Sequence, residues 1–355
     1  MPAKSSSRTS ATSSRRTILR LKVIPWERII SPFPSERGGS MSSLGIDIGG
    51  ANLKVASKDG WEIIYFPMWR EAERLEGKLR EIAEKYSTAK AGVVMTAELA
   101  DFFKSRAEGV EFIAKACKKA FEDVRFLDVE GNLKSDIDNP ENFAASNWVA
   151  SCRFLLEEAY RNFLFVDMGS TTTDIIPVTS KIEAAKTDFE RLKRGELIYF
   201  GVLRTPVFYV LKEFEGAPLC PEFFAITADV FVTTGDIKEE DYSCDTPDGK
   251  GRSREECMRR LARTVCSDLE ELGEEKVKEL ALEAKWAMID RLSEVIEHKS
   301  KIYGLKTVFA CGIGEFLIAE ACEEAGAECR LISELYGDYS KLFPAYAMLK
   351  LVEQH

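Results

Sequence analysis

The chain has 355 residues, of which 49 are Lys or Arg, 59 are Asp or Glu and only two are His. This length and an apolar fraction of 45% suffice for one large core or two medium ones, which excludes a disordered tail or a fibre. His298 and His355 cannot supply a three-histidine zinc site. We therefore expect any chemistry to depend on carboxylates, lysines, hydroxyls or backbone amides.

Charge is divided unevenly along the chain. Residues 1–40 carry eight Lys or Arg and two acidic residues, a net charge of +6, which leaves −16 for the remainder. A body of that charge lacks the basic surface of a general nucleic-acid binder. The nine cysteines are odd in number and include no CxxC pair, which is typical of reduced core thiols in a cytoplasmic protein.

The first forty residues are rich in Ser and Arg and contain no secretory apolar segment. Their composition is similar to an organelle transit peptide or a basic tail. Met41, however, stands directly before a strand-like run, so we interpret 1–40 as a disordered or mis-called N-terminal extension. No window of 18 apolar residues predicts a membrane span, and we expect a cytoplasmic location.

The body opens with a strand, a glycine turn and a hairpin. The next segments alternate between helical and strand periodicity, and Ser105 with Glu108 predicts a helix-capping box. The expected strands are 44–48, 52–57, 61–66, 91–95 and 125–129, and a helix is expected over 71–86.

The same opening pattern returns about 120 residues later. A strand over 163–166 leads into the turn Asp167–Asp174, and a strand over 175–178 follows. This repetition predicts two similar lobes that face each other. Beyond them we expect one or two helices over 253–300, a strand over 307–310 and a helix over 315–324 that Gly326 ends.

Two turns offer groups for binding an anion or a metal. In the first, Gly49 and Gly50 let backbone amides approach an anion, Lys54 adds positive charge and Asp47 can hold hydrated magnesium. A structural hairpin would explain the same residues.

The second turn has Gly169, four hydroxyls at 170–173, and the carboxylates of Asp167 and Asp174, which suit a metal better than bare phosphate. With the strand-to-helix junction Gly312-Ile313-Gly314, the two turns suggest phosphates held between lobes. The polar loop 245–254 is either a lid over an anion or a solvated connector.

This arrangement resembles the superfamily of acetate and sugar kinases, heat-shock ATPase chaperones and actin. The matching segments are Asp47–Lys54, Phe165–Ile175, Phe309–Phe316 and Pro344–Val352. The resemblance implies an α/β, two-lobed actin-like ATPase (ribonuclease H-like) fold of duplicated βββαβα lobes with a cleft between them. The lobes would span 41–160 and 161–355, the second with a helical insertion at about 245–300 and a C-terminal helix able to return to the first lobe.

A narrower resemblance covers nearly all of 41–355. The string DMGSTTTD is similar to the hydantoinase and oxoprolinase branch. The chain further resembles the methanofuran-biosynthesis synthase family of tetrahydromethanopterin-linked one-carbon metabolism through GIDIGGANLK, VVMTAELADFF with SRAEGV, AASNWVAS, FVDMGSTTTDI, YFGVLRTPV and TPDGKGRS.

That resemblance implies a transferase that joins a furan diphosphate to the phenol oxygen of gamma-glutamyl-tyramine and releases diphosphate. Magnesium would be the cofactor, bound by Asp47, Asp167 and Asp174. Asp47, Asp174 and Glu98 are the predicted catalytic residues, with Asp101 the other candidate base. The residues expected around the diphosphate or a further ligand group are Gly49, Gly50, Asn52, Lys54, Gly169, Ser170, Thr171, Thr172, Gly312 and Gly314.

Several alternatives stay open from the sequence. Arg204 is either a partner for glutamyl carboxylates or one half of an ion pair. The same loops would serve an ATP-dependent small-molecule kinase, a hydantoinase-like ATPase or a nucleotide-sensing module. Small molecules are the expected partners, with no nucleic acid and no membrane, and the oligomeric state is open.

Overall fold

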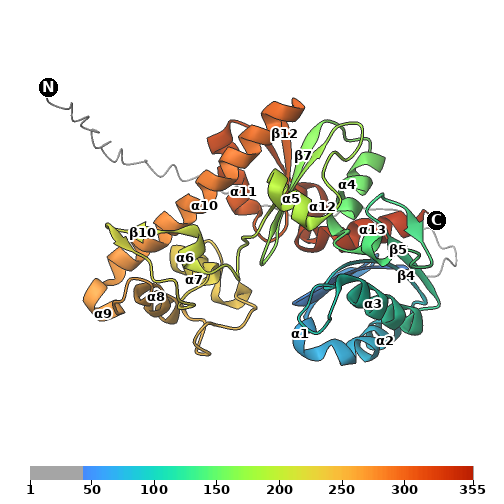
Figure 1. The fold of residues 1–355 in the computed structure, drawn as a ribbon, viewed down its shortest axis with the longest axis horizontal. Coiled ribbons are helices and arrows are strands. Elements are labelled where there is room, and N and C mark those ends of the chain that lie inside the picture. The colour runs from blue at the N-terminus through green and yellow to red at the C-terminus, as the bar shows by residue number, and fades with distance from the viewer. Residues whose placement is uncertain (1–42, 355) are drawn as a thin grey trace, which may run out of the picture. The chain divides into compact units, whose positions relative to one another are not determined.

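The strands around the first glycine turn form one six-stranded sheet (Figure 1). The computed structural model describes residues 43–354, so the prediction for 1–40 lies outside the described residues. Strand β1 pairs antiparallel with β2 and parallel with β4. In order across the sheet, the strands are β3 (Gly60–Tyr65), β2 (Asn52–Ser57), β1 (Ser43–Gly49), β4 (Lys90–Thr96), β5 (Asp123–Leu127) and β6 (Leu133–Lys134).

A second sheet repeats this plan. Its β7 pairs antiparallel with β8 and parallel with β12, as β1 does with β2 and β4. The strand order is β13 (Glu328–Leu331), β12 (Thr307–Cys311), β7 (Phe163–Met168), β8 (Thr173–Val178) and β9 (Leu197–Ile198). The predicted duplication of one α/β motif is therefore confirmed.

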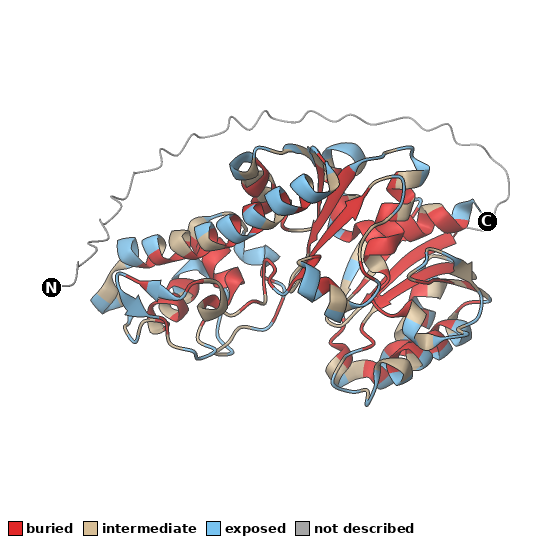
Figure 2. Cartoon of the chain, turned by 45° about the horizontal axis from the view of Figure 1, so that its top comes forward, coloured by how far each residue is buried: buried red, intermediate tan, exposed pale blue. Residues whose placement is uncertain are grey.

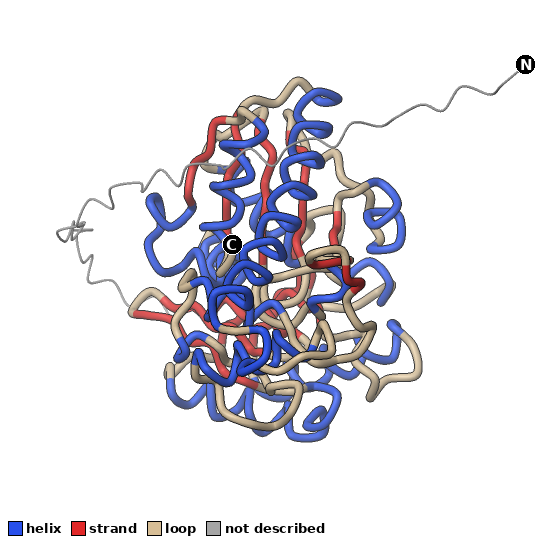
Figure 3. The backbone as a smooth tube through the Cα atoms, turned by 90° about the vertical axis from the view of Figure 1, so that its left-hand side faces the viewer, coloured by secondary structure: helices blue, strands red, loops and turns tan. Residues whose placement is uncertain are grey.

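Helices cover both sheets, so the central strands β1, β4, β7, β8 and β12 lie buried (Figures 2 and 3). Half of the predicted capping box of α3 is confirmed, because Ser105 Oγ accepts a hydrogen bond from the Glu108 backbone N–H at 3.2 Å. The Glu108 carboxylate accepts from the Lys104 backbone N–H at 2.8 Å, where a capping box would use that of Ser105. Gly326, at φ +65°, ends α11 as expected. These helices are α1 (Met68–Glu71), α2 (Leu75–Lys85), α3 (Arg106–Ala120), α4 (Asn147–Glu157), α5 (Asp188–Arg194), α11 (Glu315–Ala325), α12 (Ile332–Tyr336) and α13 (Phe343–Glu353). Short 3-10 turns cover η1 (Ala72–Arg74), η2 (Pro140–Phe143), η3 (Glu239–Asp241) and η4 (Gly337–Leu342).

Helix α13 packs against the first sheet and against α4. The contact is close at Gly45 of β1, where an added Cβ would lie 1.8 Å from the Ala345 carbonyl oxygen. At Gly92 of β4 it would lie 2.6 Å from a Val352 methyl group. Only glycine at these two positions lets the helix lie directly on the strands.

The remaining helices form an insertion between β9 and β12. Four of them pack along α10, which extends from the second sheet (Figure 1). They begin earlier than the predicted 245–300, because the chain after β9 already forms α6 and then α7. The inserted elements are α6 (Val207–Val210), β10 (Glu213–Phe214), β11 (Ala217–Pro218), α7 (Thr227–Thr234), α8 (Arg254–Arg263), α9 (Leu269–Leu272) and α10 (Glu274–Tyr303).

Within the described residues, none of the helices combines the length and the apolar character needed to cross a membrane.

Candidate active site

The two Asp-containing hairpin turns line one cavity of about 280 Å³, here called the phosphate cavity. One turn joins β1 to β2, and the other joins β7 to β8. The structure thereby brings together residues from both sheets that the sequence singled out. Those that line the cavity are Asp47, Gly49, Gly50, Asn52, Lys54, Glu98, Asp167, Gly169, Ser170, Thr171, Thr172 and Asp174.

Lys54 interacts with carboxylates of both turns. It faces Asp47 across the β1–β2 pair, and its Nζ lies 3.2 Å from Asp47 Oδ2. Burial opposes the charge on Lys54, but the carboxylates of Asp47 and Asp167 outweigh burial and raise its pKa. Lys54 is therefore protonated at neutral pH and supplies positive charge where the two turns meet.

Asp167 ends β7 on the opposite side of the cavity. Burial, assisted by the nearby carboxylates of Asp174 and Asp47, raises the pKa of Asp167 to about 7, although Lys54 acts in the opposite direction. Carboxylates that crowd one another in this way favour a bound cation, because a cation relieves their repulsion.

Asp174 forms an ion pair with Arg191, a residue that the sequence analysis did not identify. Arg191 of α5 is 1% exposed and forms an ion pair with Asp174. Its guanidinium also lies 3.1 Å from Asp188 Oδ1 and 4.7 Å from the ring centroid of Trp148. No local pattern marks Arg191, since only the fold brings α5 against the end of β8.

The predicted magnesium group of Asp47, Asp167 and Asp174 is not preformed. Across residues 43–354, no cluster of three or more His, Cys, Asp or Glu side chains is arranged to hold a metal ion. Asp174 faces Arg191 instead, so a metal role for Asp174 stays a prediction without support from the geometry.

Asp47 and Asp167 do fit a divalent cation. Asp47 is 2% exposed, and its Oδ1 has no hydrogen-bond partner among the described residues. The cavity wall carries five carboxylates against three cationic side chains, an excess of negative charge that would repel a diphosphate. Those side chains are Asp47, Glu98, Asp167, Asp174 and Asp188, against Lys54, Arg191 and Arg204. Hard oxygen ligands of this kind suit magnesium.

A segment after β9 holds the second turn in place. The backbone N–H groups of Leu203 and Arg204 donate to the Ser170 carbonyl at 3.0 and 2.9 Å, and that of Val202 donates to Gly169 at 3.0 Å. The segment YFGVLRTPV therefore supports the second turn through its backbone, a role that the sequence analysis did not predict.

Gly312 and Gly314 lie beside the second turn but outside the cavity wall. A Cβ on Gly312, whose φ is +89°, would lie 2.5 Å from Asp167 Oδ1, and one on Gly314 would lie 2.4 Å from Met168 Sδ. In the structure the two glycines let the chain pass close to β7. That Gly312 and Gly314 contact a ligand directly stays a prediction.

Glu98 follows β4 and faces the phosphate cavity. It is 2% exposed, and its Oε2 makes no hydrogen bond within the part of the chain that the structure describes. Burial raises its pKa to about 7, and the neighbouring Asp188 adds to the effect. Asp101, the other candidate base, is exposed and lines neither of the cavities described here.

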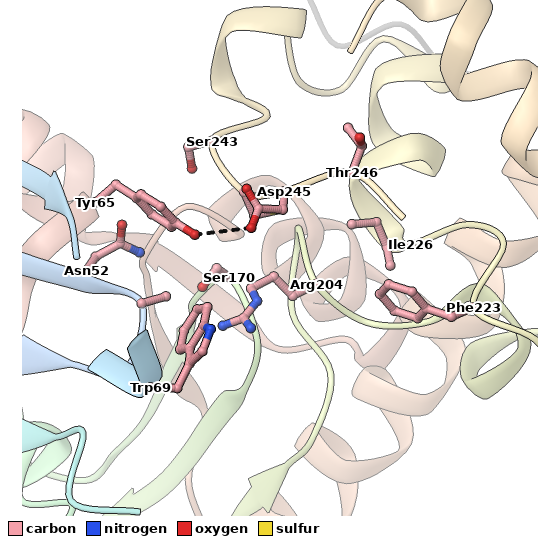
Figure 4. Close-up of a pocket in the computed structure, with 12 residues that line it drawn as sticks. Asn52, Tyr65, Trp69, Ser170, Arg204, Phe223, Ile226, Ser243, Asp245 and Thr246 are labelled. Atoms are coloured by element: carbon pink, nitrogen blue, oxygen red, sulfur yellow. Dashed lines mark hydrogen bonds between the residues drawn. The ribbon is translucent and has the colours of Figure 1, made fainter. Parts of the chain in front are cut away.

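A second cavity of about 310 Å³, here called the aromatic cavity (Figure 4), shares lining residues with the first. Tyr65, Trp69 and Phe223 give it an aromatic lining, and Asp245 lies at its edge. Arg204 lines both cavities and places its guanidinium carbon 5.1 Å from the ring centroid of Trp69. The site thus combines an anion-binding region with an aromatic compartment.

Comparisons with known proteins agree with this architecture. The model of the hydantoinase/oxoprolinase family matches residues 90–351. A solved structure of acetone carboxylase, nucleotide-free, superimposes with a TM-score of 0.52 at 10% identity, covering 87% of this chain and 70% of that one. The likeness shows the fold alone, and the predicted two-lobed actin-like ATPase fold is confirmed.

Two curated relatives share one name, (4-{4-[2-(gamma-L-glutamylamino)ethyl]phenoxymethyl}furan-2-yl)methanamine synthase. The one from Methanocaldococcus jannaschii is 40% identical over 88% of this chain and 97% of its own length. The one from Methanococcus vannielii is 37% identical over 56% of this chain and 95% of its own length. The chain therefore belongs to the hydantoinase/oxoprolinase family and, within it, to the family of these furan-methanamine synthases.

Proposed function

We propose that the protein condenses 5-(aminomethyl)-3-furanmethanol diphosphate with gamma-glutamyl-tyramine and releases diphosphate. The product is the aryl ether that the name of the two relatives describes. The observation that carries the proposal is the match to a relative of this name along nearly the whole length of both chains. A cavity walled by two phosphate-type turns, with an aromatic compartment beside it, supports the assignment.

The reaction exchanges one C–O bond for another. The bond between the furan CH2 and the diphosphate breaks, and the electron pair leaves with the diphosphate. The phenol oxygen of gamma-glutamyl-tyramine bonds to the same CH2, and the phenol proton passes to a base. The protein contributes by orienting the two substrates and by stabilising the negative charge that gathers on the leaving group.

Lys54 and the two turns are suited to hold the diphosphate. Lys54 lies against Asp47 and supplies positive charge at the junction of the turns. The Ser170 and Thr171 side chains face the same cavity and offer hydroxyl donors to phosphate oxygens. Asp47 and Asp167 would hold magnesium, and the ion would neutralise charge on the departing diphosphate when bound.

Glu98 is the base that the cavity favours for the phenol proton. With a pKa of about 7, its carboxyl group can accept a proton near neutral pH and release it afterwards. Its Oε2 is buried and has no hydrogen-bond partner among the described residues, so no protein group competes for a proton there. Leu99 and Tyr199, each 59% exposed, line the same cavity and provide an apolar surface for the tyramine ring.

The test is to incubate the protein with both substrates and magnesium, and to measure pyrophosphate release together with the aryl ether by mass spectrometry. Lys54→Met should lower kcat/KM by roughly 100-fold or more, because it removes a charge that stabilises the leaving group. Lys58→Met is the matched control, since Lys58 is exposed and lies outside both cavities.

Absence of product at saturating substrate would refute the proposal. ADP formation from ATP that is lost in Lys54→Met would favour the kinase alternative instead. The comparison of the two lysine variants separates an effect at the site from a general loss of positive charge.

A further inference from the structure

The aromatic cavity is joined to the phosphate cavity through a common wall. Ala51 and Asn52 of the first turn, Ser170 of the second turn and Arg204 line both cavities. A molecule whose anionic end lies between the two turns therefore extends directly into the aromatic cavity. No part of the predicted phosphate chemistry requires Tyr65, Trp69 or Phe223, so this compartment needs an explanation of its own.

Arg204 stands at the junction of the two cavities. Its backbone N–H donates to the Ser170 carbonyl at 2.9 Å, which ties it to the second turn. Its guanidinium carbon lies 5.1 Å from the ring centroid of Trp69, and within residues 43–354 Arg204 makes no ion pair with a carboxylate. A cation held in place without a protein counter-charge is suited to bind an anionic group of a ligand.

Asp245 provides a carboxylate at the edge of the aromatic cavity (Figure 4). The Tyr65 hydroxyl donates to Asp245 Oδ2 at 3.5 Å, and Arg70 Nη2 lies 3.4 Å from the same oxygen. Arg70 and Asp245 are 56% and 69% exposed, so their pairing is weak and a ligand cation can replace it.

The loop that carries Asp245 is anchored in the insertion. Asp248 Oδ1 lies 3.1 Å from Nη1 of Arg260, a fully buried residue that also pairs with Asp229 at 2.8 Å. Arg263 contacts the other oxygen of Asp248 at 3.0 Å. The loop beside the aromatic cavity is thus anchored to one buried charge pair, Arg260 with Asp229, and Asp245 extends from the loop toward β3 and α1.

We propose that the aromatic cavity binds the furan ring and the aminomethyl group of the diphosphate substrate. The inference rests on the proposed function. In that substrate one CH2–O bond connects the ring to the diphosphate, so the ring must occupy a compartment that adjoins the phosphate cavity. Asp245 pairs with the aminomethyl ammonium, and Arg204 contacts the diphosphate at the junction.

The aromatic lining suits the charge that develops in the reaction. As the C–O bond breaks, its electron pair goes to the diphosphate and positive charge spreads over the CH2 and the furan ring. The π faces of Trp69 and Tyr65 stabilise a cation at close range. The phenol oxygen then supplies the electron pair of the new bond, and its proton passes to the base.

The acceptor substrate fits this compartment less well than the furan does. Gamma-glutamyl-tyramine carries a carboxylate next to its ammonium group, and Asp245 would repel that carboxylate. Its phenol must also reach a base, and Glu98 lies in the phosphate cavity and not in the aromatic one. The two substrates would therefore approach the reacting carbon from different cavities.

The test measures binding without turnover. Calorimetry with the full chain and magnesium gives the Kd of pyrophosphate, of the furan diphosphate and of the same diphosphate without its aminomethyl group. Trp69→Ala should raise the Kd of the furan diphosphate roughly 10-fold and leave that of pyrophosphate within about twofold. Trp69→Phe, which keeps an aromatic face, should restore most of the affinity.

Asp245→Asn should weaken binding of the furan diphosphate about threefold and have no effect on the analogue without the aminomethyl group. Trp286→Ala and Asp290→Asn are matched controls on the exposed surface of α10, away from both cavities. Both controls should bind all three ligands as the wild type does.

The proposal is overturned if Trp69→Ala weakens pyrophosphate as much as the furan diphosphate, or if it raises the KM of gamma-glutamyl-tyramine alone. Loss of binding of a non-hydrolysable ATP analogue in Trp69→Ala, with the furan diphosphate unaffected, would assign the cavity to a nucleotide and also overturn it. The proposed function fails separately, through absence of aryl ether with the wild type, whatever the binding data show.

Discussion

Replacing Gly201 by alanine should displace the second phosphate turn and impair catalysis. A Cβ at this position would lie 2.5 Å from the Thr171 backbone nitrogen and 2.6 Å from both the Gly169 carbonyl oxygen and the Ser170 carbonyl carbon. All three are backbone atoms of the turn, so no side-chain rotation relieves the overlap.

The size of the effect follows from these distances. Ordinary contact begins at about 3.4 Å, so the turn has to shift by roughly 1 Å, and a displacement of that size in a catalytic group costs on the order of 100-fold in rate. Overpacking of this kind destabilises a fold by about 1 to 3 kcal/mol. We expect kcat/KM to fall about 100-fold and the Kd of pyrophosphate to rise in parallel.

The assay combines steady-state kinetics, calorimetry with pyrophosphate and urea unfolding. Gly77→Ala in α2 is the matched control, because nothing lies within 4 Å of the added Cβ and alanine favours the helix. It should leave activity unchanged and stabilise the protein by up to about 1 kcal/mol. Wild-type kinetics and pyrophosphate affinity in Gly201→Ala would refute the reasoning.

Three further predictions concern charged groups. Glu98 has a pKa of about 7, so activity should fall below about pH 7 and Glu98→Gln should weaken that dependence; the part that remains belongs to Asp167, whose pKa is also about 7. The raised pKa of Glu98 stabilises the fold below about pH 4.5, and this contribution is lost as the pH rises through about 7. In urea unfolding, Glu98→Gln should therefore be more stable than the wild type, by up to about 3 kcal/mol, only at a pH above about 7. Arg191→Met leaves Asp174 buried without a partner and should cost about 3 to 5 kcal/mol in urea unfolding, and adding Asp174→Asn should recover part of it; no recovery would contradict the pairing. In a magnesium titration of activity, Asp167→Asn should raise the magnesium concentration that gives half the maximal rate. An equal rise in Asp174→Asn would show that Asp174 also binds the metal.

Most of the elements that build the site could be predicted from local sequence. The strand, glycine turn and returning strand at Asp47 and Asp167 are short-range patterns, and the structure places each predicted hairpin. The cap at Ser105 and the end of a helix at Gly326 likewise depend on neighbours within a few residues. Such features can be predicted because the interactions that cause them join residues only a few positions apart.

The partners of Asp174 and the aromatic cavity could not be predicted in this way. Arg191 meets Asp174 only after α5 folds back along β8, and Trp69 meets Arg204 only when the two sheets have assembled. Nothing in the sequence around either residue distinguishes it from other arginines or tryptophans. The predicted magnesium group rested on residue type, on position in the two turns and on a family resemblance, and none of these reveals that Asp174 has a cationic partner.

The packing of α13 on β1 and β4 has a consequence for the order of folding. The strands of the first sheet are synthesised early, yet the helix that covers Gly45 and Gly92 is encoded at the opposite end of the described chain. The ribosome must therefore synthesise the chain as far as α13 before that face of the sheet can be shielded from water. Until then the early strands expose apolar surface, which favours aggregation of the incomplete chain.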